Sequence, residues 1–184
     1  MRKVTLTVIA AAIAASATPA MANNNDNFEG PRAEILAGYE HISASSLPTK
    51  EDGVAFGIAA GYDLNAGPVL IGAEAELSDS STDRSLGAPF KAETGRTIYG
   101  GVRIGTALSS KAMVYVKGGY ANSELRVTNA GNTFFVTELD GIRGGAGVEY
   151  KINDSMHVKG EYRYSNYNNT VSSHQAMAGI GIRF

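Results

Sequence analysis

The sequence predicts an all-β protein, a transmembrane β-barrel of eight antiparallel strands connected in up-and-down order. Three observations predict this fold. Eight segments alternate apolar and polar residues with a period of two, the repeat of a strand whose two faces meet different surroundings. The connections between these segments alternate between long and short. The polar faces place glycines between charged residues, as the narrow interior of an eight-stranded barrel requires.

Residues 1–22 are expected to be a signal peptide rather than part of the fold. Arg2 and Lys3 form a positive start, residues 4–17 are uncharged, and Ala20-Met21-Ala22 fits a small-x-small cleavage site. The apolar run is too short and too rich in alanine to span a bilayer well. We therefore expect an exported barrel domain, residues 23–184, that begins with a polar and flexible stretch up to residue 30.

The composition excludes several functions. The chain has 22 glycines and only 18% charged residues, which favours strands and tight turns over helices. It has no cysteine, so thiolate metal sites and cysteine nucleophiles are excluded. Without Arg2 and Lys3, 14 basic residues stand against 18 acidic ones, a net charge of −4. This balance argues against a nucleic-acid partner.

The first four predicted strands are residues 32–42, 53–64, 69–78 and 96–108. Each places branched or aromatic residues at every second position, a composition typical of strands. A turn signal, Asn65-Ala66-Gly67-Pro68, joins the second to the third, whereas a long polar connection precedes the fourth. The apolar faces contain Ile35 and Tyr39, then Phe56 and Ile58, then Ile71 and Leu77, then Val102 and Ile104.

The last four predicted strands are residues 113–121, 141–152, 156–165 and 173–184. The first of these continues less regularly towards Val127. Short polar turns precede the first and third of them, a long loop precedes the second, and a medium loop precedes the last. In such a barrel the short turns and the C-terminus share one end, which we expect to be periplasmic, and the long loops face the cell exterior.

The polar face is expected to point into the barrel. Long charged side chains fit a narrow interior only beside small neighbours, and they are tolerated there only when paired. The charges on this face have both signs, which predicts a plug of salt bridges rather than an open pore. This predicted lumen charge network consists of Glu34, Glu74, Glu76, Arg103, Lys117, Arg143, Glu149, Lys159, Glu161, Arg163 and Arg183. His157 has the same parity and is expected to join it.

The aromatic residues of the apolar face lie near strand ends. Amphipathic rings prefer the two interfaces of a membrane, so this placement predicts two aromatic girdles. Tyr39, Tyr120, Tyr162 and Tyr164 form the one at the loop end, and Tyr62, Tyr150 and Phe184 form the one at the turn end. A soluble lipocalin-like barrel, with its apolar residues inside, is the alternative arrangement of the same alternation.

The final segment resembles the terminal strand of bacterial outer-membrane barrels, since its apolar face runs to a last Phe184. Residues 33–39, 99–105 and 140–150 have the cadence of the small OmpA/OmpX-like family, which includes the opacity and porin-family β-barrel proteins. The resemblance implies an outer-membrane location among lipid and lipopolysaccharide. It also implies recognition by the barrel-assembly machinery through the C-terminal strand.

No catalytic, cofactor-binding or metal-ligating set is assigned from the sequence. His41 and His174 lie on the apolar face of neighbouring strands near the loop end, and Ser43 and Ser173 accompany them. Because no acidic residue is identifiable to orient either ring, polar residues at the membrane rim are the favoured interpretation. His157 has no histidine, cysteine or carboxylate at a metal-site spacing in the sequence.

The third long loop, residues 122–139, is the strongest candidate for an interaction surface. Its two halves could continue a hairpin above the membrane, and an exposed strand edge can recruit another chain. The candidate contact residues are Val127, Phe134, Phe135 and Val136. We therefore expect a structural or surface-interaction role towards a host or neighbouring cell, with a narrow low-conductance porin and a lipid A modifying enzyme as alternatives.

Overall fold

The structure is a computed structural model that describes residues 28–44, 50–81, 83–85, 90–129, 132–167 and 171–184. The predicted signal peptide lies outside these residues. The described part of the chain contains no helix that is long and apolar enough to cross a membrane.

The described residues form nine strands, eight of which build the barrel. The remaining strand, β4, has only three residues and lies outside the barrel wall. The strands are β1 (Gly30–Ala44), β2 (Lys50–Asn65), β3 (Leu70–Ser80), β4 (Asp83–Ser85), β5 (Phe90–Ala107), β6 (Ala112–Asn129), β7 (Asn132–Lys151), β8 (Met156–Tyr167) and β9 (Val171–Arg183).

The barrel is closed and antiparallel throughout. Each barrel strand pairs with its neighbour in the chain, with β3 pairing directly to β5, and β9 returns to pair with β1. In this closing pair Ile35 lies opposite Ile180, and Arg32 lies opposite Arg183. Closure leaves no free edge within the barrel wall. The predicted eight-stranded up-and-down fold is confirmed.

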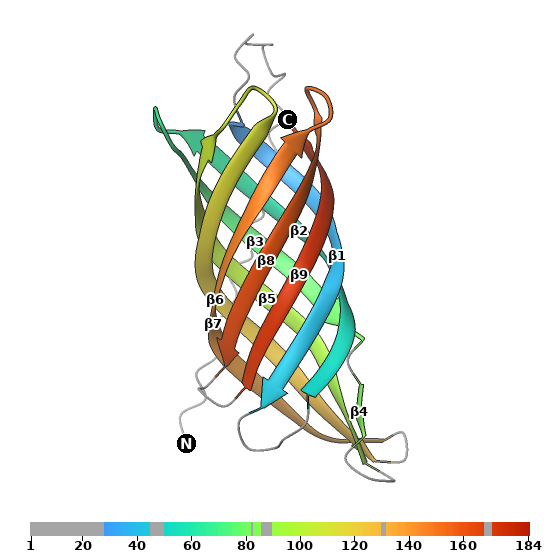
Figure 1. Cartoon of the computed structure of the whole chain (residues 1–184). Helices are drawn as coiled ribbons and strands as arrows, with labels where there is room; N and C mark the ends of the chain where they lie inside the picture. The colour runs from blue at the N-terminus through green and yellow to red at the C-terminus, as the bar shows by residue number, and fades with distance from the viewer. Residues whose placement is uncertain (1–27, 45–49, 82, 86–89, 130–131, 168–170) are drawn as a thin grey trace.

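Short turns gather at one end of the barrel. Residues 66–69, 108–111 and 152–155 connect strands there, closed by bonds such as Ala66 N to Val69 O and Ile152 N to Met156 O. Phe184 lies at this turn end, where its N–H donates to the Pro31 carbonyl. The opposite end, here the loop end, carries β4 and the far ends of β5, β6 and β7 (Figure 1).

The predicted long loops are largely strand, which corrects the expected loop lengths. β5 already begins at Phe90, and β6 and β7 pair as far as Asn129 and Asn132. Beyond the membrane neither face meets lipid, so the alternation fades, while the ladder still satisfies the backbone hydrogen bonds. Figure 1 shows β5, β6 and β7 extending past the ends of β1 and β9 at the loop end.

The outer surface of the barrel is apolar and the interior is charged. Ile35, Ile58, Val102 and Ile142 are all exposed on the outside, between 57% and 71% of their full area. Arginine, lysine and glutamate side chains of the alternating positions are buried. A soluble barrel has the reverse arrangement, so the lipocalin-like alternative is wrong.

Candidate functional site

Charge fills the interior and is balanced. All eleven residues of the predicted lumen charge network are buried inside the barrel, and His157 is buried with them. Among the described residues the buried carboxylates are Glu34, Glu40, Asp63, Glu74, Glu76, Glu149 and Glu161, and the buried cations are Arg32, Arg103, Lys117, Arg143, Lys159, Arg163 and Arg183. With seven of each sign, these buried charges compensate one another in number, as charges removed from water require.

Asp63 on β2 is the centre of the network nearest the turn end. Its carboxylate accepts hydrogen bonds from three guanidinium groups: Arg32 Nε at 3.0 Å, Arg103 Nε at 2.7 Å and Arg183 Nη1 at 2.8 Å. Arg103 and Arg183 also reach Glu149, at 3.2 and 2.7 Å. Ion pairs at this level therefore connect five strands of the barrel: β1, β2, β5, β7 and β9.

The middle of the interior is organised around two lysines. Lys117 Nζ lies 2.6 Å from Glu74 and 2.7 Å from Glu161, while Lys159 Nζ lies 2.6 Å from Glu34. Lys159 Nζ also lies 4.0 Å from Glu74, so each ammonium group lies between carboxylates of other strands. Closer to the loop end, Glu76 is the shared acceptor: Arg143 and Arg163 lie 3.2 and 2.7 Å from its Oε1.

Two inward tyrosines fill the space between the charges. The Tyr115 hydroxyl donates to Glu161 at 2.6 Å, and the Arg103 guanidinium lies 4.9 Å from its ring centre. Tyr99 stands under Lys117 and Arg143, which lie 4.9 and 5.4 Å from its ring centre. A side chain at Gly101 would collide with the Tyr99 hydroxyl, so this glycine is needed to make room for the ring.

The strand register brings two carboxylates to His157 that the sequence does not place near it. Glu34 Oε1 lies 3.0 Å from its Nε2, and Glu149 Oε1 lies 4.0 Å from its Nδ1. These three residues have the atom types of a metal site. Arg32 and Lys159 already bind Glu34, and Arg183 binds Glu149, so an added cation would meet strong repulsion.

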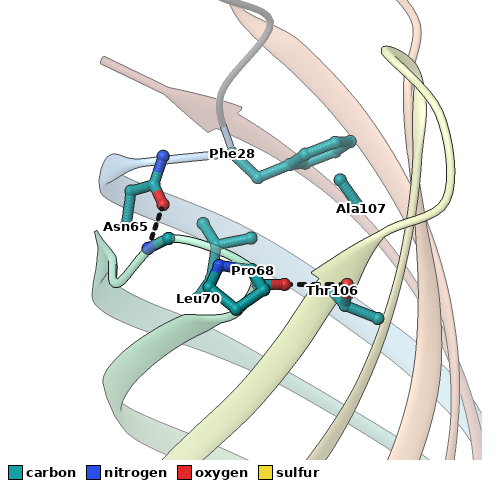
Figure 2. Close-up of a pocket in the computed structure, with 7 residues that line it drawn as sticks. Phe28, Asn65, Pro68, Leu70, Thr106 and Ala107 are labelled. Atoms are coloured by element: carbon teal, nitrogen blue, oxygen red, sulfur yellow. Dashed lines mark hydrogen bonds between the residues drawn. The ribbon is translucent and has the colours of Figure 1, made fainter.

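Phe28 closes the turn end of the interior. Its ring is fully buried beside Leu70 and Met113, and Arg183 donates to its carbonyl at 2.7 Å. Figure 2 shows the ring reaching across towards Ala107. Together with Pro68 and Leu70, Phe28 lines a hollow of about 260 Å³. The expectation that residues 23–30 are a flexible stretch is wrong for Phe28, whose carbonyl and ring are both held.

The aromatic residues predicted as girdles all point outward. Tyr39 and Tyr162 both lie opposite Ala176, on either side of β9, near the loop end. Tyr62 lies opposite Pro31 at the turn end. The exposed rings are Tyr39, Tyr62, Tyr120, Tyr150, Tyr162, Tyr164 and Phe184. Their function as girdles stays a prediction.

Three of the fourteen buried charges, Arg32, Glu40 and Asp63, are absent from the network predicted from the sequence. Arg32 shares the parity of Glu34 and stands at the start of the first predicted strand, so its parity was the available signal. Asp63 was placed on the polar face but was not assigned as a partner. Its three-arginine contact depends on the register between strands that are far apart in the sequence, which parity alone does not determine.

The two outer histidines face each other across the closing pair of strands. His41 lies directly opposite His174. The expectation that no acidic residue orients either ring is wrong, because Asp52 Oδ1 lies 2.6 Å from His41 Nδ1. Ser173 points inward and donates to Glu40 at 2.7 Å, so it does not share a face with His174.

The far end of β7 has one unpaired edge. Its pairing with β8 stops at Gly141, opposite Tyr167, whereas its pairing with β6 continues to Asn132. In the described part of the chain no strand covers the other side of residues 132–140. Val127 and Phe135 are paired in this hairpin, as are Arg126 and Val136. The side chains of Val127, Phe134, Phe135 and Val136 lie outside the described part.

Comparisons with known proteins agree with this architecture. The family model described as the outer membrane protein β-barrel domain matches residues 8–184. The chain belongs to this family. Its membership gives the protein an outer-membrane location, and it explains the inverted faces of the barrel, because lipid replaces water around the outer surface.

The chain is also similar to immunogenic outer-membrane proteins of Brucella. The chain is 33% identical over 142 residues to the 31 kDa outer-membrane immunogenic protein of Brucella melitensis biotype 1, a match that covers 68% of this chain and 58% of that protein. It is 27% identical over 148 residues to the 25 kDa outer-membrane immunogenic protein of Brucella ovis, covering 80% and 72%. The chain thus spans less than two thirds of the 31 kDa relative.

Solved structures show the same fold at low identity. Neisserial surface protein A superposes with a TM-score of 0.67 at 19% identity, covering 84% of this chain and 97% of that one. Ail, the attachment invasion locus protein of Yersinia pestis, superposes with a TM-score of 0.62 at 16% identity, covering 85% and 99%. Ail has also been solved with sucrose octasulfate, a heparin analogue.

Proposed function

We propose that this outer-membrane barrel serves surface interaction without catalysis, with its loop end at the cell exterior. The filled interior holds the wall rigid among lipid and lipopolysaccharide. The extended ends of β5, β6 and β7 then carry the binding surface. The observation that supports this role is the free edge of β7 at residues 132–140, which continues a rigid wall into the solvent.

The edge is long enough to receive another strand. At about 3.3 Å per residue, residues 132–140 offer an edge about 30 Å long, along which every second residue turns its backbone N–H and C=O away from β6. A partner in extended conformation would complete the ladder by strand addition, a recurring mode of peptide recognition. Proteins usually cover or shorten an exposed strand edge, because such an edge recruits other chains. An edge left open is therefore consistent with a binding role.

Charge near this edge favours a basic partner. Glu138 and Asp140 are exposed on β7, and Glu124 lies directly opposite Glu138 on β6. These carboxylates oppose pairing between two copies of the hairpin, because like charges would meet. Among described exposed side chains of the loop end, the carboxylates of Asp52, Asp79, Glu138 and Asp140 stand against the guanidinium of Arg96. A sulfated ligand such as the one bound to Ail fits this surface less well than an extended basic polypeptide.

A proline scan along residues 134–139 tests strand addition. Proline removes one backbone N–H, and successive N–H groups of an edge strand point alternately to β6 and away from it. We expect adhesion of cells bearing the protein to cultured epithelial cells to fall at every second position while the barrel stays folded. At the intervening positions proline breaks the β6 ladder. Adhesion that stays unchanged at all positions would remove the proposal.

Deleting the end of the hairpin is a second test of the same surface. Residues 127–135 can be replaced by Asn-Gly, which closes a two-residue turn between Arg126 and Val136, a pair in the native register. The barrel below Gly141 keeps all its wall pairings. We expect adhesion to be lost as completely as in the best proline variants, with unchanged heat-modifiable gel mobility.

A narrow porin is the first alternative, and the interior argues against it. Arg143, Arg163, Lys117 and Glu76 are all buried inside the lumen. We expect no steady current above the bilayer baseline in planar-bilayer recordings. A triple variant, Glu76→Ala, Arg143→Ala and Arg163→Ala, removes one carboxylate and the two guanidiniums bound to it, and is the positive control for an opened lumen. Steady conductance of the unmodified barrel contradicts the filled interior.

A lipid A modifying enzyme is the second alternative. The structure adds one observation in favour of this enzyme: an acidic residue, Asp52, orients His41. Ser43 follows His41 by two residues on the same outer face. Mass spectrometry of lipid A from cells with and without the protein, and with His41→Ala, discriminates. A mass change that depends on His41 would replace the non-catalytic proposal.

A further inference from the structure

Four side chains from four neighbouring strands form a row on the outside of the barrel at the loop end. Asp52 of β2 lies opposite His41 of β1, which lies opposite His174 of β9, which lies opposite Tyr164 of β8. We call this set the rim row. It crosses the junction of β1 and β9, the pairing that joins the first described strand to the last.

Both imidazoles of the rim row are held through the same ring nitrogen. His41 Nδ1 lies 2.6 Å from Asp52 Oδ1, and His174 Nδ1 lies 2.6 Å from the Tyr162 hydroxyl. A carboxylate only accepts, so neutral His41 donates from Nδ1 and carries its lone pair on Nε2. Within the described residues neither Nε2 atom has a hydrogen-bond partner.

For His41 this arrangement is that of a metal-ligating histidine, and His174 matches it when its Nδ1 donates to the Tyr162 hydroxyl. A ligating imidazole commonly donates its other N–H to a carboxylate or another oxygen, which fixes the tautomer and aims the ring. Directly opposite residues of an antiparallel pair have Cβ atoms about 4.5–5.5 Å apart. Two imidazoles at that spacing can place both Nε2 atoms about 2.0–2.1 Å from one ion.

The rim row is accessible to dissolved ions. It lies one step of the alternation beyond the row of Tyr39 and Tyr162, a rise of about 5 Å along a tilted strand. The side chain of His41 is 30% exposed and that of Asp52 is 58% exposed. The row therefore lies on the loop-end side of Tyr39 and Tyr162, at the level of Tyr164.

We propose that His41 and His174 bind one divalent transition-metal ion, such as Zn²⁺ or Cu²⁺, through their Nε2 atoms. Imidazole suits these ions, and water completes the coordination. Asp52 and Tyr162 act as positioning residues, each through an Nδ1. The ion joins β1 to β9 and so holds the junction between the first and last strands at the loop end.

The chain offers little competition for such an ion. It contains three histidines and no cysteine. The third histidine, His157, is enclosed in the interior, where Arg32, Lys159 and Arg183 hold the two carboxylates beside it. A bound ion at the rim row can thus be assigned by histidine substitution alone.

The test uses the full folded barrel in detergent micelles. Cu²⁺ electron paramagnetic resonance should show couplings to two imidazole nitrogens, and Zn²⁺ titration calorimetry should give one ion per barrel. We expect His41→Ala and His174→Ala each to weaken binding by tenfold or more. Asp52→Asn should weaken it by about 10-fold, the effect of losing an outer-shell partner. Ser43→Ala, on the same face beside His41, is the matched control and should bind as the unmodified protein does.

A second readout follows the stability of the barrel. Because the ion binds the folded state, Zn²⁺ should raise the temperature at which the compact gel mobility is lost. This shift should vanish in the double variant His41→Ala, His174→Ala, which retains the hairpin and interior. Equal binding by the double variant overturns the proposal. So does loss of binding in His157→Gln with retention in the double variant, since the ion would then lie in the lumen.

Discussion

Replacing Asp63 with alanine is expected to lower the free energy of unfolding by about 3–5 kcal/mol. The substitution removes the acceptor shared by Arg32, Arg103 and Arg183. Glu149 remains for two of these guanidiniums, and Glu34 and Glu74 remain for Arg32, but the buried charge is no longer balanced. The loss therefore comes from an uncompensated buried cation rather than from three independent bonds.

The chain offers both a control and a partial rescue. Asp79→Ala removes an exposed carboxylate at the loop end and should change stability by about 0.5 kcal/mol or less. Adding Arg103→Met to Asp63→Ala removes a cation together with the anion, so the two effects should not add. The chain has no tryptophan, so circular dichroism and unboiled gel mobility in urea are suitable measurements. If Asp63→Ala is as mild as Asp79→Ala, water screens the interior charges.

The faces of the barrel could be predicted from the sequence because lipid and lumen demand opposite side chains at every second residue. That demand acts on each strand separately, so local parity suffices to assign Ile58 to the outside and Arg143 to the inside. All eleven predicted lumen residues are buried for this reason. The predicted family follows from the same periodic signal.

The contacts between strands could not be predicted in the same way. Which carboxylate meets which guanidinium depends on the stagger of strands around the barrel, and Arg143 meets Glu76 from β3 across the lumen. The same holds for Asp52, whose position opposite His41 depends on the register of the first hairpin. The sequence did suggest that the two halves of residues 122–139 continue a hairpin, and β6 and β7 do pair there. The length of this hairpin could not be predicted, because the ladder of hydrogen bonds continues where the alternation ends.

Placing arginine at Ile58 is expected to destabilise the barrel in lipid vesicles by about 2–4 kcal/mol. Ile58 points outward on β2 and lies opposite Ile35 and Leu77. It stands four residues from Val54, which lies opposite Tyr39, and four residues from Tyr62. It therefore falls at the middle of the apolar band, where a guanidinium has neither water nor a partner within reach.

Val54 gives the matched position on the same strand. It is 56% exposed and Ile58 is 57% exposed, so area alone predicts the same effect for both. Because Val54 lies at the level of the loop-end tyrosines, arginine there can extend to water and should cost about 0–1 kcal/mol. Urea unfolding of both variants in vesicles, with Ile58→Leu for packing, separates the two expectations. A clear difference between two equally exposed sites requires a medium that changes with depth. Equal and small effects would mean that the outer surface of the barrel meets water along its whole height.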